Sequence, residues 1–236
     1  MILKIEPNDY LEKTIIILSE AGLPEVAEKQ SAYMRNKFPF FGITSPRSKP
    51  LFKQLFKSYG KFTDTELIEF VRLCFENEYR EVHYFGILMV EKQIIKQKAY
   101  FSDFLEEMII TKSWWDSVDW ISKMIGIHFS RFPEQIIPVT RRWMDRGNIW
   151  LQRVSIIFQR YKNYPTNEVL LYQYILELKY SQEFFIQKAA GWALRNHSKE
   201  NPESVRKFIK NNPELSSLTI REAQKYLELY QKKTSF

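Results

Sequence analysis

Apolar residues recur at spacings of three and four along almost the whole chain, in segments of roughly 12 to 18 residues. This period is typical of amphipathic helices, whose apolar face packs against a core. Strand signals are nearly absent, since the chain has no Asn-Gly or Asp-Gly dipeptide and no sustained alternation of apolar and polar residues. The pattern predicts an all-α protein.

Residues typical of helix ends stand between these segments. Asn201 followed by Pro202 predicts a helix that begins at the proline. Ser113 followed by Asp116 resembles a capping box, in which a serine side chain and an acidic side chain bind the first free amides of a helix. Glycines at expected helix ends are Gly22, Gly60 and Gly147.

The segments also repeat at a fixed interval. Residues 148–154 (NIWLQRV) match residues 183–189 (EFFIQKA) 35 positions later, and steps of 35 back from 148 reach Ser113 and Glu78, which also begin predicted helices. Helix starts at one interval, each followed by a second helix, are typical of an α-solenoid of HEAT-like helical repeats. We therefore expect one curved domain over residues 1–236 with a basic concave surface.

Positive charge is concentrated in one window of the chain. The formal net charge is +7, and residues 29–63 contain no aspartate or glutamate. Such a window can be an ordinary solvated surface, but like charges four residues apart repel each other unless a partner supplies anions. We expect that partner to be a nucleic-acid phosphate backbone. The basic residues of the window are Lys29, Arg35, Lys37, Arg47, Lys49, Lys53, Lys57 and Lys61.

Several classes of protein do not fit this composition. Cys74 is the single cysteine, so an internal disulfide is excluded and a reducing compartment is expected. The apolar run from Ile15 to Leu18 is too short for a signal peptide or membrane span, and we expect a cytoplasmic protein with no membrane partner. The histidines have no metal-ligand spacing, and no Gly-rich phosphate loop is present, so we expect neither metal nor cofactor.

Four unusual side chains fall on equivalent faces of the repeat. Trp115 and Asp119 lie four residues apart, and Arg153 and Trp192 fall at the repeat equivalents of positions 118 and 122. Successive helices would present all four along one surface, where solenoids bind ligands. The structural alternative is that the tryptophans are core residues, that Asp119 stabilises a helix start, and that Arg153 is its ion-pair partner.

The blocks at 33–43, 113–119, 148–153 and 183–195 together resemble the AlkD-like DNA alkylation-repair glycosylases, in the family's order and over nearly the whole chain. The resemblance implies a HEAT-like fold and release of N3- and N7-alkylated purines from duplex DNA. It also implies that Trp115, Asp119, Arg153 and Trp192 are the functional residues, with Tyr33 as a further candidate. The interval from Asp119 to Arg153 is one residue shorter than in the family. This chain therefore departs from the family's pattern in the loop near Arg146.

The implied chemistry suits these side chains. An alkylated purine is already cationic, so the carboxylate of Asp119 would stabilise the positive charge that grows on the sugar. Trp115 and Trp192 would offer π faces to the cation, and Arg153 would bind a phosphate. None of the four positions is a lysine, so we expect base release without strand cleavage, by a monomer that associates with the nucleoid. The residues expected to contact DNA are Tyr33, Arg47, Lys49, Lys53, Lys57, Lys61, Arg153 and Lys188.

Two other functions fit parts of the pattern. A binding module for distorted or branched DNA would need the basic surface but not Asp119 beside Trp115. A protein-interaction scaffold, a common role of helical repeats, would leave the acid-free window unexplained.

Overall fold

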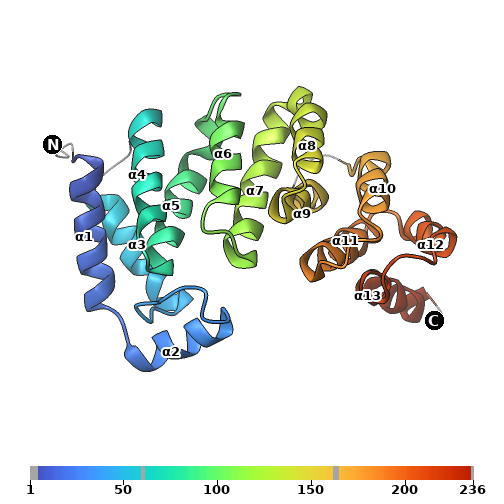
Figure 1. The fold of residues 1–236 in the computed structure, drawn as a ribbon, viewed down its shortest axis with the longest axis horizontal. Coiled ribbons are helices and arrows are strands. Elements are labelled where there is room, and N and C mark those ends of the chain that lie inside the picture. The colour runs from blue at the N-terminus through green and yellow to red at the C-terminus, as the bar shows by residue number, and fades with distance from the viewer. Residues whose placement is uncertain (1–4, 60–61, 162–164, 235–236) are drawn as a thin grey trace. The chain divides into compact units, whose positions relative to one another are not determined.

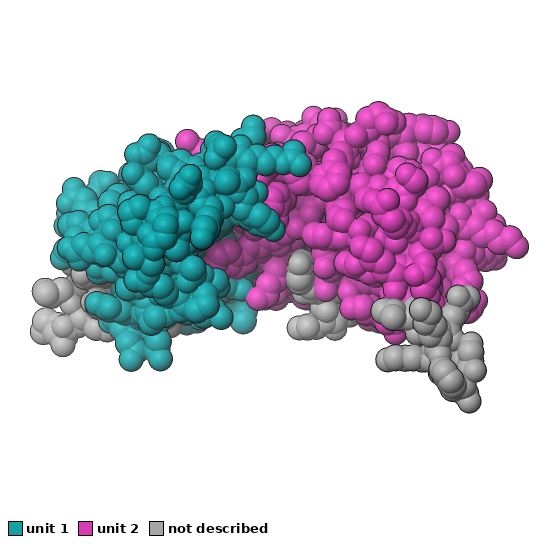
Figure 2. All heavy atoms as spheres, turned by 90° about the horizontal axis from the view of Figure 1, so that it is seen from below, with its two compact units in different colours: residues 1–97 teal, residues 98–236 magenta. Residues whose placement is uncertain are grey.

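The computed structural model describes residues 5–59, 62–161 and 165–234, and these residues form helices and connecting loops without a β-strand (Figure 1). The all-α prediction is confirmed. The chain divides into two compact units, residues 1–97 and 98–236, which are coloured separately in Figure 2. One domain over residues 1–236, its curvature and its concave basic surface stay predictions.

Unit 1 packs its helices around an aromatic core. Helix α1 contacts α3, α4 and α5, and α4 packs along α5. The Tyr10 ring lies 5.0 Å from that of Phe70 and 5.4 Å from that of Phe62, between their centroids, and Phe52 lies 5.0 Å from Phe85. Burial of these large side chains is the main stabilising contribution to the unit. The helices are α1 (Pro7–Glu20), α2 (Pro24–Tyr33), α3 (Ser45–Tyr59), α4 (Asp64–Glu76) and α5 (Arg80–Gln93), followed by the short 3-10 helix η1 (Ile94–Lys96).

A buried carboxylate fixes the loop between α2 and α3. Glu81 is 1% exposed, and its two oxygens accept hydrogen bonds from the backbone amides of Phe41, Gly42 and Ile43 at 3.0–3.1 Å. These bonds replace the water that a buried carboxylate loses. The loop that precedes the basic helix α3 is therefore held in place by α5.

Unit 2 consists of consecutive helix pairs. The second helices of the pairs form one row, in which α7 contacts α9, α9 contacts α11, and α11 contacts α13. The starts of α7, α9 and α11 are 34 and 35 residues apart, as a helical repeat requires. The helices are α6 (Phe101–Ile110), α7 (Trp115–Arg131), α8 (Ile136–Asp145), α9 (Ile149–Ile157), α10 (Glu168–Glu177), α11 (Phe184–His197), α12 (Pro202–Asn211) and α13 (Ser217–Thr234), with 3-10 helices η2 (Pro133–Gln135) and η3 (Phe158–Tyr161).

Helix α9 lies at the centre of unit 2. It contacts α6, α7, α8, α10 and α11, and most of its side chains are buried, including Leu151, Val154 and Ile156, which have no exposed surface. An apolar sequence around the whole circumference is typical of a helix enclosed by neighbours. Arg153 is a charged residue on this enclosed helix, so its burial is a consequence of the position of α9.

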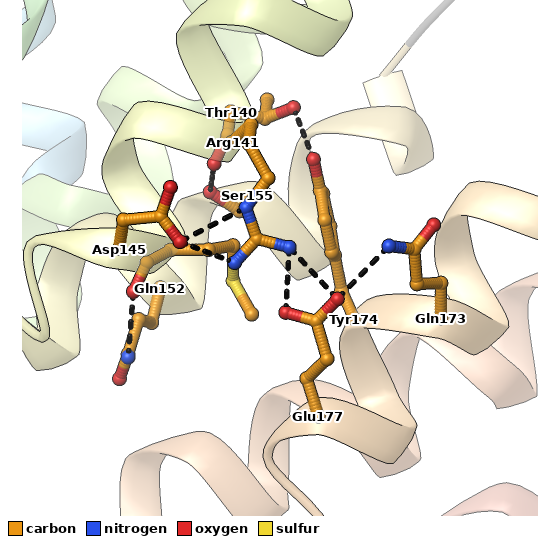
Figure 3. Close-up of polar contacts among 9 residues, drawn as sticks. Thr140, Arg141, Asp145, Gln152, Ser155, Gln173, Tyr174 and Glu177 are labelled. Atoms are coloured by element: carbon orange, nitrogen blue, oxygen red, sulfur yellow. Dashed lines mark hydrogen bonds and ion pairs between the residues drawn. The ribbon is translucent and has the colours of Figure 1, made fainter.

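Polar contacts join α8, α9 and α10 beside this core (Figure 3). The Arg141 guanidinium donates to Glu177 of α10 at 2.7 and 2.8 Å and to Asp145 of its own helix at 2.7 and 3.0 Å. The hydroxyls of Thr140 and Tyr174 lie 2.8 Å apart, which links α8 to α10. Because Tyr174 is 1% exposed, its hydroxyl needs this partner.

Of the two helix caps expected from the sequence, the cap at Asn201 is confirmed and the cap at Ser113 is wrong. Asn201 caps α12 by accepting a hydrogen bond from the amide of Ser204, and Asn148 caps α9 in the same manner. Ser113 does not cap α7, because its hydroxyl donates instead to the carbonyl of Ile109 at 2.7 Å. The residue before α7 is Trp114, in extended conformation and without a side-chain cap.

Gly147 ends the turn after α8 with a φ of +66°, a conformation that costs other residues energy. Gly22 likewise follows the end of α1, while Gly60 lies outside the described residues.

Candidate active site

An aromatic cluster aligns the beginnings of α7, α9 and α11. The ring of Trp114 lies 5.8 Å from that of Trp150 and 5.2 Å from that of Phe185, and Trp150 lies 4.9 Å from Phe185. Trp150 and Phe185 are the second residues of α9 and α11, and Trp114 directly precedes α7, so the packing of these rings brings the first turns of the three helices together. Trp150, which the repeat pattern placed level with Trp115, is a core residue at 9% exposure.

Asp119 of α7 and Arg153 of α9 form a bidentate ion pair. Arg153 donates from Nε to Oδ1 of Asp119 and from Nη2 to Oδ2, both at 2.7 Å. The Arg153 side chain is 1% exposed and that of Asp119 is 17% exposed. The two parallel bonds fix the plane of the carboxylate, and the side chain remains partly exposed.

The third nitrogen of the guanidinium also has a hydrogen-bond partner. Nη1 of Arg153 donates to the backbone carbonyl of Phe185 at 2.7 Å. One side chain thus connects α7, α9 and the first turn of α11. Arg153 is not exposed to a phosphate in this structure, so its burial favours the ion-pair alternative over the phosphate contact expected from the sequence.

Trp115 shares α7 with Asp119, and Trp192 belongs to α11, which packs against the helix that carries Arg153. Trp115 is the first residue of α7, is half-buried, and lies one helical turn before Asp119. Trp192 of α11 is also half-buried, and the Arg153 guanidinium carbon lies 5.4 Å from its ring centroid. The structure therefore connects Asp119, Arg153 and Trp192 directly, and it places Trp115 on the helix face of Asp119.

A small residue allows α13 to approach the helix that carries Trp192. A side chain at Gly191 would place its Cβ 2.5 Å from Cβ of Glu222 and 2.9 Å from the carbonyl oxygen of Thr219. Only glycine allows this contact. Glu222 is brought next to the site by this packing.

Lys188 is part of an ion-pair cluster around Glu222. The carboxylate, which is 3% exposed, accepts from Lys188 at 2.6 Å, from Lys225 at 2.7 Å and from Arg195 at 3.4 Å. Burial raises the pKa of Glu222, but hydrogen bonds and charges of the two lysines outweigh burial and lower the pKa to about 2. The carboxylate is thus charged at neutral pH, and Lys188, expected to contact DNA, has an intramolecular partner.

The other expected DNA contacts are on unit 1. Tyr33 ends α2 and is 70% exposed. Lys49, Lys53 and Lys57 lie one helical turn apart on α3, all exposed, and Arg47 is exposed in the first turn of the same helix. Lys61 lies outside the described residues. The single basic face expected for Lys49, Lys53 and Lys57 is present.

A family model described as DNA alkylation repair enzyme matches residues 17–227. The chain belongs to the DNA alkylation repair enzyme family. No protein with a curated description matches it.

Solved structures agree with the family assignment. A structure described as a predicted DNA alkylation repair enzyme from Enterococcus faecalis is 32% identical, with a TM-score of 0.82, and the match covers 87% of this chain and 96% of that one. AlkD2 from Streptococcus mutans is 14% identical with a TM-score of 0.64, over 94% of this chain and 99% of that one. Smu.31 from Streptococcus mutans UA159 is 16% identical with a TM-score of 0.59, over 75% and 92%. The last two show the helical-repeat fold alone.

Two side chains that lie beside these residues were not predicted from the sequence. Arg160, whose guanidinium carbon lies 5.3 Å from the Trp192 ring centroid, was not singled out, although it follows Arg153 by two helical turns. Glu222 was also missed, because neither spacing nor composition indicates that α13 packs against Gly191. The seven-residue interval between the arginines is the signal that could have identified Arg160.

Over the described ranges, no group of three or more histidine, cysteine, aspartate or glutamate residues could hold a metal ion. Within the same part of the chain, none of the helices has the length and apolar character needed to cross a bilayer.

Proposed function

We propose that the chain is a monofunctional DNA glycosylase, which hydrolyses the N-glycosidic bond of cationic N7- and N3-alkylated purines in duplex DNA. The observation that carries this proposal is the Asp119 carboxylate, held by two 2.7 Å bonds from a buried arginine and still 17% exposed. A fixed, partly exposed carboxylate on the helix face of a tryptophan suits a reaction in which positive charge develops on a sugar.

In the proposed reaction the bond between C1′ and the purine nitrogen breaks, and its electron pair neutralises the cationic base. Positive charge then develops on C1′ and the ring oxygen of the sugar, where the Asp119 carboxylate stabilises it. A water molecule forms the new bond to C1′ and releases its proton to solvent, which leaves an abasic site and the free base. The base needs no protonation, because alkylation has already given it a positive charge.

Trp115 and Trp192 would attract the cationic base or sugar through their π faces, each by roughly 0.5 to 2 kcal/mol depending on desolvation. We assign Arg153 a positioning role, since each of its three side-chain nitrogens donates a hydrogen bond to Asp119 or to the Phe185 carbonyl. The planar guanidinium of arginine fixes the orientation of a carboxylate through two parallel hydrogen bonds, which the ammonium group of lysine cannot do.

The exposed basic face of α3, with Tyr33 and Arg47 on the same unit, would contact the phosphate backbone of duplex DNA. We further propose that the enzyme acts as a monomer on nucleoid DNA in the cytoplasm. It would need no cofactor, since the leaving group is already activated.

The test is release of free base from duplex DNA that carries N7-methylguanine. We expect release by the parent and a loss of at least about 100-fold in Asp119→Asn, which keeps the shape of the side chain but removes its charge. Asp103→Asn, which removes an exposed carboxylate elsewhere in unit 2, should retain parental activity. No release by the folded parent would contradict the proposal.

A second candidate, a non-catalytic module that binds distorted or branched DNA, is favoured by one observation. Both oxygens of Asp119 already accept hydrogen bonds from Arg153, and this pairing partly neutralises the charge that catalysis would use. Salt-sensitive binding of duplex or branched DNA by a parent that releases no base would support this candidate.

A further inference from the structure

The turn after α2 holds an arginine in a backbone conformation that favours glycine. Arg35 follows Met34, the residue that caps α2, and its φ is +55°. The amide of Arg35 donates to the carbonyl of Ala32 at 2.9 Å, and the amide of Asn36 donates to the carbonyl of Ser31 at 2.7 Å. These two bonds form a Schellman motif, in which the residue after the cap is usually glycine.

Arg35 is the unusual residue of this turn. Asn36 also has a left-handed φ, of +54°, but asparagine enters this region more readily than most other residues. An arginine there is unfavourable, because its Cβ comes close to the following carbonyl oxygen. Backbone strain of this kind concentrates at ligand-binding sites, where the side chain has a task that offsets it.

The turn is fixed on both sides by the helices of unit 1. The hydroxyl of Ser31 in α2 donates to the carbonyl of Phe38 at 3.1 Å, and the amide of Arg80 in α5 donates to the carbonyl of Pro39 at 3.0 Å. The guanidinium carbon of Arg80, a fully buried residue, lies 3.9 Å from the centroid of the Phe38 ring. Arg35 is therefore presented from a rigid backbone.

The side chain of Arg35 is available to a ligand. It is exposed, as are Asn36 and Lys37 beside it, and within the part of the chain that the structure describes its guanidinium has no hydrogen-bond or ion-pair partner. The turn also lies in the window 29–63, which contains no acidic residue. A phosphate suits such a group, because its oxygens can accept two parallel hydrogen bonds from a guanidinium.

We propose that Arg35 binds a phosphodiester of duplex DNA, and that the chain retains it at the expense of stability. The residue belongs to the basic window but not to the DNA contacts expected from the sequence, so this contact is separate from the basic face of α3. The inference rests on the proposed function for its ligand, duplex DNA, but not on the chemical step.

A structural alternative gives Arg35 a different task. A cation at the C-terminal end of a helix is stabilised by the helix dipole, and Arg35 stands at that end of α2. Under this alternative, removal of the charge would lower stability and leave DNA binding unchanged. A phosphate contact predicts the opposite for both quantities when glycine replaces the arginine.

The test combines thermal unfolding with the salt dependence of binding to a short duplex that carries a tetrahydrofuran abasic-site analogue. For Arg35→Gly we expect a Tm higher by about 2 to 4 °C, because the strain is relieved. The slope of log K against log salt concentration should be smaller by about 0.9, and the affinity in low salt about tenfold lower.

Two further variants separate charge from backbone. Arg35→Gln removes the charge but keeps the strain, so we expect the same loss of slope with a Tm within about 2 °C of the parent. Lys207→Gln, which removes an exposed positive charge on α12, should change neither the slope nor the affinity.

Parental slope and affinity in a folded Arg35→Gln would overturn the inference, and a lower Tm in both Arg35 variants at parental slope would favour the helix-dipole alternative. A Tm that does not rise in Arg35→Gly would contradict the expense in stability. Base release by the parent with an unchanged Arg35→Gln slope would reject the phosphate contact alone. A reduced slope without base release by the parent would reject the glycosylase and leave the contact supported.

Discussion

Burial determines what Arg153 can do. Removal of a guanidinium from water is unfavourable unless it is paired and hydrogen-bonded, and here each of its three nitrogens donates to Asp119 or to the Phe185 carbonyl. The same bonds orient the carboxylate that we place at the centre of the reaction. Structure and proposed catalysis therefore depend on one ion pair.

We expect Arg153→Met to lower both stability and activity. Breaking a largely buried pair should decrease the free energy of unfolding by roughly 2 to 4 kcal/mol. Urea denaturation measures this change. An arginine elsewhere in unit 2 whose side chain is 35% exposed, tested as Arg206→Met, should change stability by less than about 1 kcal/mol. If the Arg153→Met variant were as stable as the parent, the ion pair with Asp119 would not stabilise the packing of these helices.

Glu222 should give the protein part of its sensitivity to acid. Its pKa is lowered from 4.5 to about 2 in the folded protein, so its stabilising contribution is complete above pH 4.5 and is lost as the pH falls toward about 2. Denaturation across this range should show a weaker pH dependence in Glu222→Gln than in the parent. Equal pH dependence in the two proteins would contradict the assignment.

The sequence alone predicted which of these residues lie close together better than it predicted the surroundings of each one. Repeat spacing placed Asp119, Arg153 and Trp192 on adjacent helices, and the structure connects them directly. It could not predict that Arg153 is enclosed, because its burial depends on how α7, α9 and α11 pack.

At the scale of elements, the helical repeat positions the site through the aligned starts of α7, α9 and α11. The interval from Trp115 to the start of α9 is 34 residues and the next is 35. The sequence predicted these starts within two residues, because apolar spacing marks whole helices more clearly than their ends. It failed for the cap at Ser113, whose hydroxyl bonds to the preceding helix.

The contact between α11 and α13 should be sensitive to one methyl group. Gly191→Ala would place Cβ 2.5 Å from Cβ of Glu222, so we expect a loss of about 1 to 3 kcal/mol and weaker DNA binding through displacement of Trp192. Thermal unfolding and DNA binding measure the two effects. Gly147→Ala is the comparison: nothing lies within 4 Å of its Cβ, and its φ of +66° should cost stability, by about 1 to 2 kcal/mol, without weakening binding. Equal DNA binding by both variants would contradict this role for α13.

At the scale of the whole molecule, exposed positive charge should contribute mainly to the affinity for DNA and little to the rate of base release. Lys49, Lys53 and Lys57 are exposed along one face of α3, in a window without acidic residues. The window was evident in the sequence because charge can be counted without a fold. Its expected concave location could not be derived, since that depends on how the helices assemble.

Replacement of these three lysines by glutamine should reduce the salt-dependence slope of duplex binding by about 2 to 3. The rate of base release at saturating enzyme should change little. A variant with glutamine at the exposed Lys199, Lys207 and Lys210 controls for the change in net charge. An equal decrease of the salt-dependence slope in the two variants would mean that DNA binding depends only on the net charge of the protein.

The proposed role of Asp119 is tested most directly by single-turnover release of N7-methylguanine, with enzyme in excess and at saturation. Under these conditions the rate reports the chemical step rather than DNA affinity. We predict a rate at least about 100-fold lower for Asp119→Asn than for the parent, with similar duplex affinity. An equal rate for the two folded proteins would contradict the assignment of Asp119 as the catalytic carboxylate.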